Sequence, residues 1–354
     1  MTDSKKSLWY ERYPRVTLAL VSLAGIFVVI ACAEIFARYF IPQWAPVTSE
    51  RAKFWQFDNL LGWSQIPGQK AAFRHPDFST WVEINSLGLR DREYSVVRNT
   101  KKRMLVLGDS YGWGFGVNNN EIFTELLEAR HPDWEIINAS VSGYGTVQQY
   151  LYLAQRGILL KPDMVLLLFN DNDFQDSVGI TEYWYNKPIV TKTDEGYAIT
   201  GLPVAPQTLH QQLDVFFLGN FYIARGLYST LEIPVNLLVD LFSSEPPHGE
   251  IDSLEATGFV LGKMMALDQS QQIQTVIVET PLSDIKHTAI AAQCVKYAVP
   301  CLHLKDTFRV GKKIQWHFEH DRHWNQTGHR MAADAVDDFL AKQQRWDNPK
   351  GLVF

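Results

Sequence analysis

A serine, a glycine and an asparagine each follow an apolar run in this chain, and a histidine lies in a polar block near the C-terminus. Ser110 belongs to Gly108-Asp-Ser110, just beyond the apolar run that ends at Leu107. A serine presented at the exit of a strand can act as a nucleophile when a neighbouring base takes its proton. The tripeptide alone is weak, because a chain of average composition would contain it by chance about one time in ten. Its place at a strand exit makes Ser110 the candidate nucleophile.

Hydrogen-bond donors follow two further apolar runs. Gly143 lies in a loop where the missing side chain would let a backbone N–H approach a ligand, although it could also be an ordinary loop glycine. Asn172 lies in Phe169-Asn-Asp-Asn-Asp173, where its amide could donate to an oxyanion or only cap the next element. Gly143 and Asn172 are therefore the candidate oxyanion donors.

Four of the ten histidines fall within thirteen residues near the C-terminus. His323 is the candidate base, and Asp321 could orient its ring and stabilise the imidazolium. The alternative is a metal site built from His317, His320, His323 and Asp321. No thiolate joins these residues, and nothing in their spacing places them on one face of a helix. We predict a base and no metal.

Composition and motifs argue against two ligand classes. Gly112, Gly114 and Gly116 mimic a dinucleotide-binding loop, but no helix follows at once and no acidic residue closes the second strand. The net charge of −6 and the lack of a concentrated basic face disfavour nucleic-acid binding. We therefore expect neither a nucleotide cofactor nor a nucleic-acid partner.

The candidate residues sit in a regular alternation of apolar strands and amphipathic helices. The predicted strands are 103–107, 134–138, 164–169, 275–279 and 301–304. The predicted helices are 121–130, 147–158, one ending near 272, 284–297 and 325–341. This order predicts an α/β fold with one parallel sheet and right-handed crossovers. Ligands in such sheets bind beyond the carboxyl ends of the strands, where the candidate residues lie.

Two segments lie outside this alternation. Residues 46–100 are predicted to form a β-rich lead-in to a domain that covers 101–345. An insertion, 174–255, interrupts that domain with a predicted hairpin at 188–200 and an aromatic stretch at 213–242. These aromatics either pack the insertion onto the sheet, which is their commoner use, or form a cap over the site.

The N-terminal segment predicts a membrane anchor. Residues 16–33 contain no charge, and as a helix at about 1.5 Å per residue they nearly span a hydrocarbon layer. Basic residues dominate 1–15, so the positive-inside rule places that segment in the cytoplasm and exports the rest. We predict an uncleaved anchor over 16–40. Cleavage near Ala31-Cys32-Ala33 or lipidation of Cys32 are the alternatives, and both also export the domain.

The other two cysteines, Cys294 and Cys301, lie across a predicted helix-to-strand junction. They could pair in an oxidising compartment, but their spacing does not decide this. We expect two buried free thiols.

Taken together, the four blocks resemble the SGNH, or GDSL-type, hydrolases over residues 100–342. The matching blocks are Gly108-Asp-Ser110, Gly143, Asn172-Asp173 and Asp321-x-His323. The resemblance implies a flavodoxin-like three-layer α/β/α domain with a five-stranded parallel sheet and no cofactor. Two departures stand out: Asn170 occupies the usual glycine position of the third block, and the last block is one residue shorter than the common Asp-x-x-His.

The resemblance also implies a mechanism. His323 takes the proton of Ser110, whose Oγ attacks an ester carbonyl and forms an acyl-enzyme. The backbone N–H groups of Ser110 and Gly143 and the Asn172 amide would bind the oxyanion. Adjacent to these lie Asp109, Tyr111 and Asp173. We expect Tyr111 to line the wall of the site.

Residues 55–92 are similar to the lead-in of membrane-anchored bacterial family members associated with surface-polysaccharide loci. This similarity implies a periplasm-facing serine esterase of the inner membrane that acts on O-acyl, and above all acetyl, esters of carbohydrate. An O-acetyltransferase of an exported polysaccharide and a non-catalytic polysaccharide-binding protein are the alternatives. Polysaccharide-biosynthesis machinery would be the partner.

Overall fold

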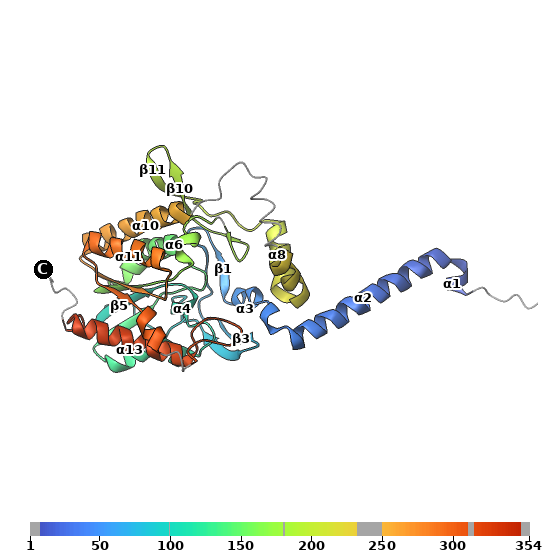
Figure 1. Ribbon diagram of the computed structural model, residues 1–354, viewed down its shortest axis with the longest axis horizontal. Coiled ribbons are helices and arrows are strands. Elements are labelled where there is room, and N and C mark those ends of the chain that lie inside the picture. The colour runs from blue at the N-terminus through green and yellow to red at the C-terminus, as the bar shows by residue number, and fades with distance from the viewer. Residues whose placement is uncertain (1–7, 99, 180, 232–249, 311–314, 348–354) are drawn as a thin grey trace, which may run out of the picture.

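A long N-terminal helix projects from the body of the protein in the computed structural model (Figure 1). The structure describes residues 8–98, 100–179, 181–231, 250–310 and 315–347. The projecting helix is α2, Pro14–Phe40, and the short α1, Trp9–Arg12, precedes it. Among the described residues, α2 is long and apolar enough to span a membrane, a property that N-terminal signal sequences share.

Five parallel strands form the central sheet. They are β5 (Lys102–Leu107), β6 (Trp134–Asn138), β7 (Met164–Phe169), β12 (Gln274–Glu279) and β13 (Cys301–His303). Their order is β13-β12-β7-β5-β6, and every neighbouring pair is parallel. This is the flavodoxin-like order, so the predicted fold class is confirmed. Because the strand order reverses between β5 and β7, the crevice for a ligand lies beyond the ends of these two strands.

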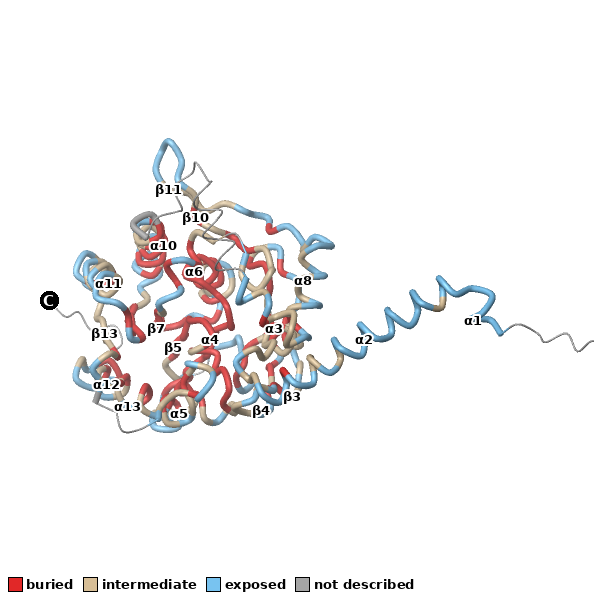
Figure 2. The backbone as a smooth tube through the Cα atoms, turned by 45° about the vertical axis from the view of Figure 1, so that its right-hand side comes forward, coloured by how far each residue is buried: buried red, intermediate tan, exposed pale blue. Residues whose placement is uncertain are grey.

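Helices cover both faces of the sheet. One face packs against α6 (Thr146–Gln155), α10 (Glu250–Gln271) and α11 (Asp284–Tyr297). The other packs against α5 (Phe123–Arg130), α12 (Lys305–Val310) and α13 (Gln326–Lys342). Figure 2 shows the buried strands between these two layers.

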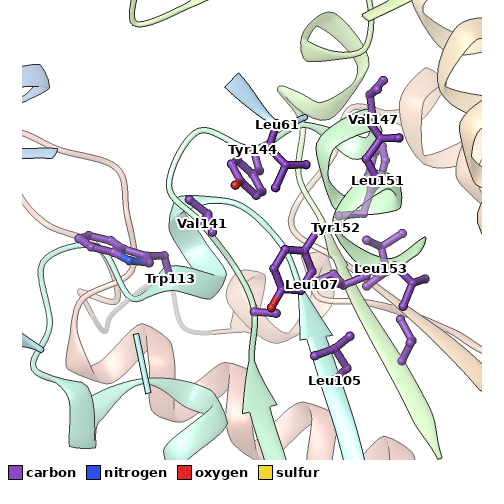
Figure 3. Packing of buried hydrophobic residues seen from close by; sticks show 14 of the residues in the cluster. Leu61, Leu105, Leu107, Trp113, Val141, Tyr144, Val147, Leu151, Tyr152 and Leu153 are labelled. Carbon is purple, nitrogen blue, oxygen red and sulfur yellow. The ribbon is translucent and has the colours of Figure 1, made fainter. Parts of the chain in front are cut away.

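The sequence of β5 explains why both faces of the sheet are covered. Successive side chains of a strand point to opposite faces. Leu105 and Leu107 join the hydrophobic cluster that contains α6, whereas Met104 and Val106 join the cluster that contains α13. Figure 3 shows the first of these clusters. An apolar run without polar interruption is therefore what a strand covered on both faces needs.

Short helical segments complete the α/β part. The four-residue α4, Ser110–Trp113, follows β5, and α7, Asp173–Asp176, follows β7. The helix expected at 147–158 is α6 followed by the 3₁₀ turn η3, Gly157–Leu160. The helix expected from residue 121 begins at Phe123, after the 3₁₀ turn η2, Asn119–Glu121.

The lead-in, residues 46–100, consists of a short helix and two hairpins that follow the 3₁₀ turn η1, Pro42–Trp44. Its elements are α3 (Thr48–Ala52), β1 (Trp55–Asp58), β2 (Gly62–Gln65), β3 (Lys70–His75) and β4 (Phe78–Glu83). The strands pair as β1–β2 and β3–β4, both antiparallel. Phe54, Trp63 and Phe73 are 0% exposed and pack in the same cluster as Leu105 and Leu107. The lead-in therefore shares its core with the sheet.

The insertion, residues 174–255, is built from small antiparallel pairs and helices. Its strands are β8 (Thr181–Glu182), β9 (Tyr185–Asn186), β10 (Ile189–Thr193) and β11 (Gly196–Thr200). The hairpin expected at 188–200 is the β10–β11 pair. Helix α8, Leu209–Asn220, follows, and residues 222–231 are helical as well. The expected aromatic stretch 213–242 continues past 231 into residues that the structure does not describe.

Cys294 and Cys301 form a disulfide, so the expectation of two free thiols is wrong. The reason lies at the end of α11, where Ala298 takes a left-handed conformation with φ of 52°. This turn sends the chain back, and the N–H of Val299 donates to the Cys294 carbonyl at 2.9 Å. The two Cα atoms are thereby brought to 6.3 Å, within the usual range for a disulfide.

Candidate active site

Ser110 is the first residue of α4, at the carboxyl end of β5. Asp109 caps this helix, because its carboxylate accepts the N–H of Tyr111 at 2.9 Å. Gly114 ends it in a left-handed conformation with φ of 85°, which favours glycine. The helix therefore lasts one turn and presents a nearly buried serine at the crevice predicted by the strand order.

His323 lies directly against Ser110. Its Nε2 is 2.7 Å from the serine Oγ, and its Nδ1 bonds to the carboxylate of Asp321. That carboxylate also accepts the backbone N–H of His323 at 2.8 Å. Burial raises the pKa of Asp321, but the hydrogen bonds and charge of His323 outweigh it and hold the pKa at about 2. With the ring proton on Nδ1, Nε2 is placed to accept the Ser110 proton.

Two aromatic rings hold the His323 imidazole. Phe115 stacks on it with 4.1 Å between ring centroids, and the Tyr111 ring lies at 4.8 Å. The Tyr111 hydroxyl donates to the carbonyl of Arg322 at 3.3 Å. Tyr111 thus lies beside the base, at the place where we expected it to line the wall. Phe115 was not among the residues singled out from the sequence.

The loop after β6 brings Gly143 to the serine turn. The N–H of Val141 donates to the carbonyl of Gly108 at 3.2 Å, which joins the two loops. Gly143 has φ of +84°, and a Cβ there would lie 2.9 Å from the Tyr183 ring. Within the described part of the chain, the N–H groups of Ser110 and Gly143 have no hydrogen-bond acceptor. Both are free to bind an oxyanion.

Asn172 is exposed at the exit of β7 and its amide is engaged by neighbours. Its Nδ2 donates to Asp176 at 2.6 Å, and its Oδ1 accepts from Asn170 at 2.6 Å. Because a side-chain amide carries two N–H donors, one is left for a ligand. The Asn172 amide can therefore still donate to an oxyanion, as expected, and its bond to Asp176 sets its orientation.

Asn170 connects three strand exits, and the sequence had marked it only as a departure from glycine. Its amide donates to Asp109 at 2.9 Å, and its Oδ1 accepts from Thr280 at 2.7 Å. Its N–H donates to Asp173, which is fully buried. Burial raises the pKa values of Asp109 and Asp173. These carboxyl groups shape the loops around Ser110.

The lead-in supplies two further supports that the sequence did not reveal. Arg90 is buried and donates to the carbonyls of Trp113, Gly114 and Val117, which follow the nucleophile. Burial lowers the pKa of Arg90 to about 9, so it is still charged at neutral pH. Asp77, in the β3–β4 turn, accepts the N–H groups of His320 at 2.8 Å and Asp321 at 3.1 Å.

Arg51 of α3 lies between aromatic rings beside the oxyanion loop. Its Cζ is 4.7 Å from the Phe115 centroid and 4.4 Å from the Tyr183 centroid. Its Nε donates to the hydroxyl of Ser142 at 2.9 Å. The guanidinium charge also contributes to the low pKa of Asp321. Arg51 of the lead-in therefore contacts Tyr183 of the insertion and acts by its charge on Asp321.

The histidines of the alternative metal site do not point to a common centre. His317 Nδ1 lies 2.7 Å from the Phe318 carbonyl, while His320 turns to Asp77 and His323 to Asp321. A different group, Glu279, His287 and His303, places its ligand atoms within 4.8 Å of one another. In this group, the Nδ1 atoms of His287 and His303 lie 2.8 and 3.1 Å from one oxygen of the buried Glu279 carboxylate. These are the distances of direct contacts between the side chains.

Comparisons with known proteins gave structural likeness only. No family model and no curated protein matches the chain. One similar solved structure is the psychrotrophic esterase EstA from Pseudoalteromonas sp., with 14% identity, 69% of this chain and 100% of that chain covered, and a TM-score of 0.41. A member of the lipolytic protein G-D-S-L family from Veillonella parvula shows 11% identity, coverage of 68% and 99%, and a TM-score of 0.41.

A two-domain esterase active on acetylated mannans shows 11% identity and a TM-score of 0.40, with 72% of this chain and 52% of that chain covered. The solved structures named here are thus esterases and lipolytic proteins of the G-D-S-L family.

Proposed function

We propose that this protein is a serine esterase of the SGNH type, held at a membrane by α2 and acting on the extracytoplasmic side. One observation carries the proposal: Ser110 Oγ lies 2.7 Å from His323 Nε2, while Nδ1 of the same ring is bonded to Asp321. A nucleophile, a base and an orienting carboxylate in this arrangement are the parts that acyl transfer to serine requires.

The reaction proceeds in two halves. His323 takes the Ser110 proton as Oγ bonds to the ester carbonyl carbon, and the tetrahedral intermediate then expels the alcohol, which receives the proton from His323. Water, deprotonated by the same ring, next attacks the acyl-enzyme and releases the acid and free Ser110. Asp321 stays ionised throughout, because its pKa of about 2 lies well below the working pH.

Three donors are proposed for the oxyanion. The unengaged N–H groups of Ser110 and Gly143 are fixed by the loops, and the free amide hydrogen of Asn172 supplies the third. Donors aimed at the developing charge stabilise the transition state more than the ground state.

The surroundings favour a small acyl group. The rings of Phe115 and Tyr111 both lie against the His323 imidazole, and the Tyr183 ring fills the space that a side chain at Gly143 would occupy. Acetyl esters therefore fit the proposal best. The similarity of residues 55–92 to anchored family members associated with surface-polysaccharide loci makes acetylated carbohydrate the proposed substrate. Hydrolysis is proposed over transfer, because transfer needs an acceptor groove that excludes water.

The test uses the full chain in detergent with 4-nitrophenyl acetate and a fluorophosphonate probe. Ser110→Ala should abolish labelling and lower turnover by more than about 10³-fold, while exposed Ser79→Ala changes neither. Asn172→Ala should lower kcat about 10²-fold. Equal labelling of wild type and Ser110→Ala would refute the proposal. Mass spectrometry of an added oligosaccharide separates hydrolysis, which leaves it unmodified, from acetyl transfer.

A further inference from the structure

Helix α8 carries an apolar face that the described protein does not cover. Leu209, Leu213, Phe216 and Phe217 recur at helical spacing and are 72%, 48%, 54% and 51% exposed. Phe221, directly after the helix, is 38% exposed. A surface helix of a protein in water normally turns polar residues outward. This helix instead presents two phenylalanines and two leucines, and Phe221 adds a third phenylalanine directly after it.

The opposite side of α8 packs on the lead-in. Gly219 is buried, and a Cβ there would lie 3.3 Å from the backbone of Ser49 in α3. The orientation of α8 is therefore fixed, with one side against α3 and the apolar side away from the body. The exposed aromatics are therefore not packed against the described part of the body.

The end of α8 is fastened to the membrane-type helix α2. The carboxylate of Glu34 accepts the N–H groups of Tyr222 at 3.0 Å and Ile223 at 3.1 Å. Arg38 donates to the Asn220 carbonyl at 3.0 Å, and its Cζ lies 5.3 Å from the Tyr222 ring. Figure 1 shows α8 beside the end of α2 that enters the body.

The contact between α2 and residues 220–223, called the α8 junction, lies at a position along α2 that determines its depth in a bilayer. Residues 16–33 form the uncharged run, which as a helix is about 27 Å long. Glu34 is the next residue, so the α8 junction falls where hydrocarbon gives way to headgroups. Aromatic side chains are favoured at that level, and helices with such a face lie in the interface plane.

We propose that the exposed face of α8, together with Phe221, docks onto the bilayer that α2 enters. The occupant is the lipid interface, because the chain at the end of α8 is bonded to α2, which is the proposed anchor, and the face is exposed beside it. This inference rests on the proposed membrane anchor. Docking would hold the catalytic body at a fixed tilt on the membrane surface.

The experiment uses the full chain with Cys32→Ser, reconstituted in phosphatidylcholine–phosphatidylglycerol vesicles. Spin labels at Leu20→Cys, Phe217→Cys and Ile285→Cys report on α2, α8 and the exposed start of α11, respectively. Collisions with oxygen, which concentrates in lipid, are compared with collisions with a water-soluble nickel chelate. Docking predicts a lipid signal at 20, an interfacial signal at 217 and an aqueous signal at 285.

Phe216→Cys and Leu213→Cys should repeat the interfacial signal and guard against a fold defect in one variant. A lipid signal at 20 with signals at 213, 216 and 217 as aqueous as that at 285 would overturn docking alone. An aqueous signal at 20, or loss of the labelled segment by cleavage, would overturn both docking and the anchor. Esterase activity of each labelled variant reports on the catalytic proposal separately.

Discussion

The lead-in and the insertion both lie beside the candidate site of Ser110 and His323, but they differ in how many of their side chains are buried. The lead-in contributes fully buried aromatics and Arg90 to the interior. The described part of the insertion is mostly exposed or half-buried, as Figure 2 shows for β11 and α8. Arg90 and Asp77 of the lead-in bond to the two loops that carry Ser110 and His323. The insertion reaches the oxyanion loop through the Tyr183 ring.

This difference separates two tasks. Buried contacts with matched hydrogen bonds hold catalytic atoms within a few tenths of an ångström, which acyl transfer requires. Exposed surface can instead meet substrate or membrane. The lead-in is therefore a structural support of the candidate site, while the insertion determines the surroundings of that site. Substitutions at matched positions in the two regions should show this.

The largest expected effect comes from Arg90→Met in the lead-in. The change removes the Arg90 donor from three buried carbonyls, of which that of Gly114 keeps the N–H of Val117 while those of Trp113 and Val117 lose their side-chain donor, at a cost of about 3–5 kcal/mol in total. The matched insertion variant is Arg225→Met, where the guanidinium lies over two rings at 5.9 Å and, within the described residues, has no ion pair. It should cost less than about 1 kcal/mol. Urea unfolding measures both, and equal losses would contradict the comparison.

Two hairpin turns offer a second matched pair. Asp77→Ala in the β3–β4 turn removes the acceptor for two N–H groups of the histidine loop. We expect kcat to fall about 10- to 100-fold with little change in KM, because the base is misplaced rather than the substrate. Asp194→Ala, in the exposed β10–β11 turn, should leave kcat unchanged.

Rescue separates positioning by Asp77 from a general loss of structure. Asp77→Asn keeps one acceptor oxygen and should restore most of kcat, and fluorophosphonate labelling rates should follow the same order. A loss of kcat in Asp77→Ala that is matched by Asp194→Ala would show that the two turns are equivalent.

The sequence predicted the scaffold well, because its signals are local. Strands β6 and β7 and helix α11 have the predicted bounds, since continuous apolar runs and amphipathic spacing reflect the layers around them. The candidate nucleophile is inferred from its place at a strand exit, and the candidate base from the Asp321-x-His323 spacing. The structure brings Ser110 and His323 into contact across 213 residues of chain.

What the sequence missed depends on contacts between distant segments. The bond between Asp77 and His320 joins residues 243 positions apart, and neither belongs to a motif that suggests the other. The Cys294–Cys301 disulfide depends on the left-handed conformation of Ala298. Because glycine and not alanine is the residue that usually adopts this conformation, nothing in the sequence predicted a turn there. The orientation of the insertion depends on the hydrogen bond from the Tyr222 N–H to the Glu34 carboxylate. From the sequence, Glu34 only marked the end of an uncharged helical run.

The smallest expected effect is a pH dependence that belongs to the insertion. Burial in β8 and the nearby charge of Asp176 raise the pKa of Glu182 from 4.5 to about 7. The folded protein therefore binds more protons than the unfolded chain between these values, so the free energy of unfolding falls as pH rises through this window and levels off above it. Glu182→Gln should be more stable than wild type at pH 8 by about 1–2 kcal/mol, a gain absent at pH 4.5.

Glu195→Gln, exposed in the β10–β11 turn, should show no such trend. Urea titrations at both pH values measure the difference, and a pH-independent effect of Glu182→Gln would mean that this part of the insertion is as open to water as the rest.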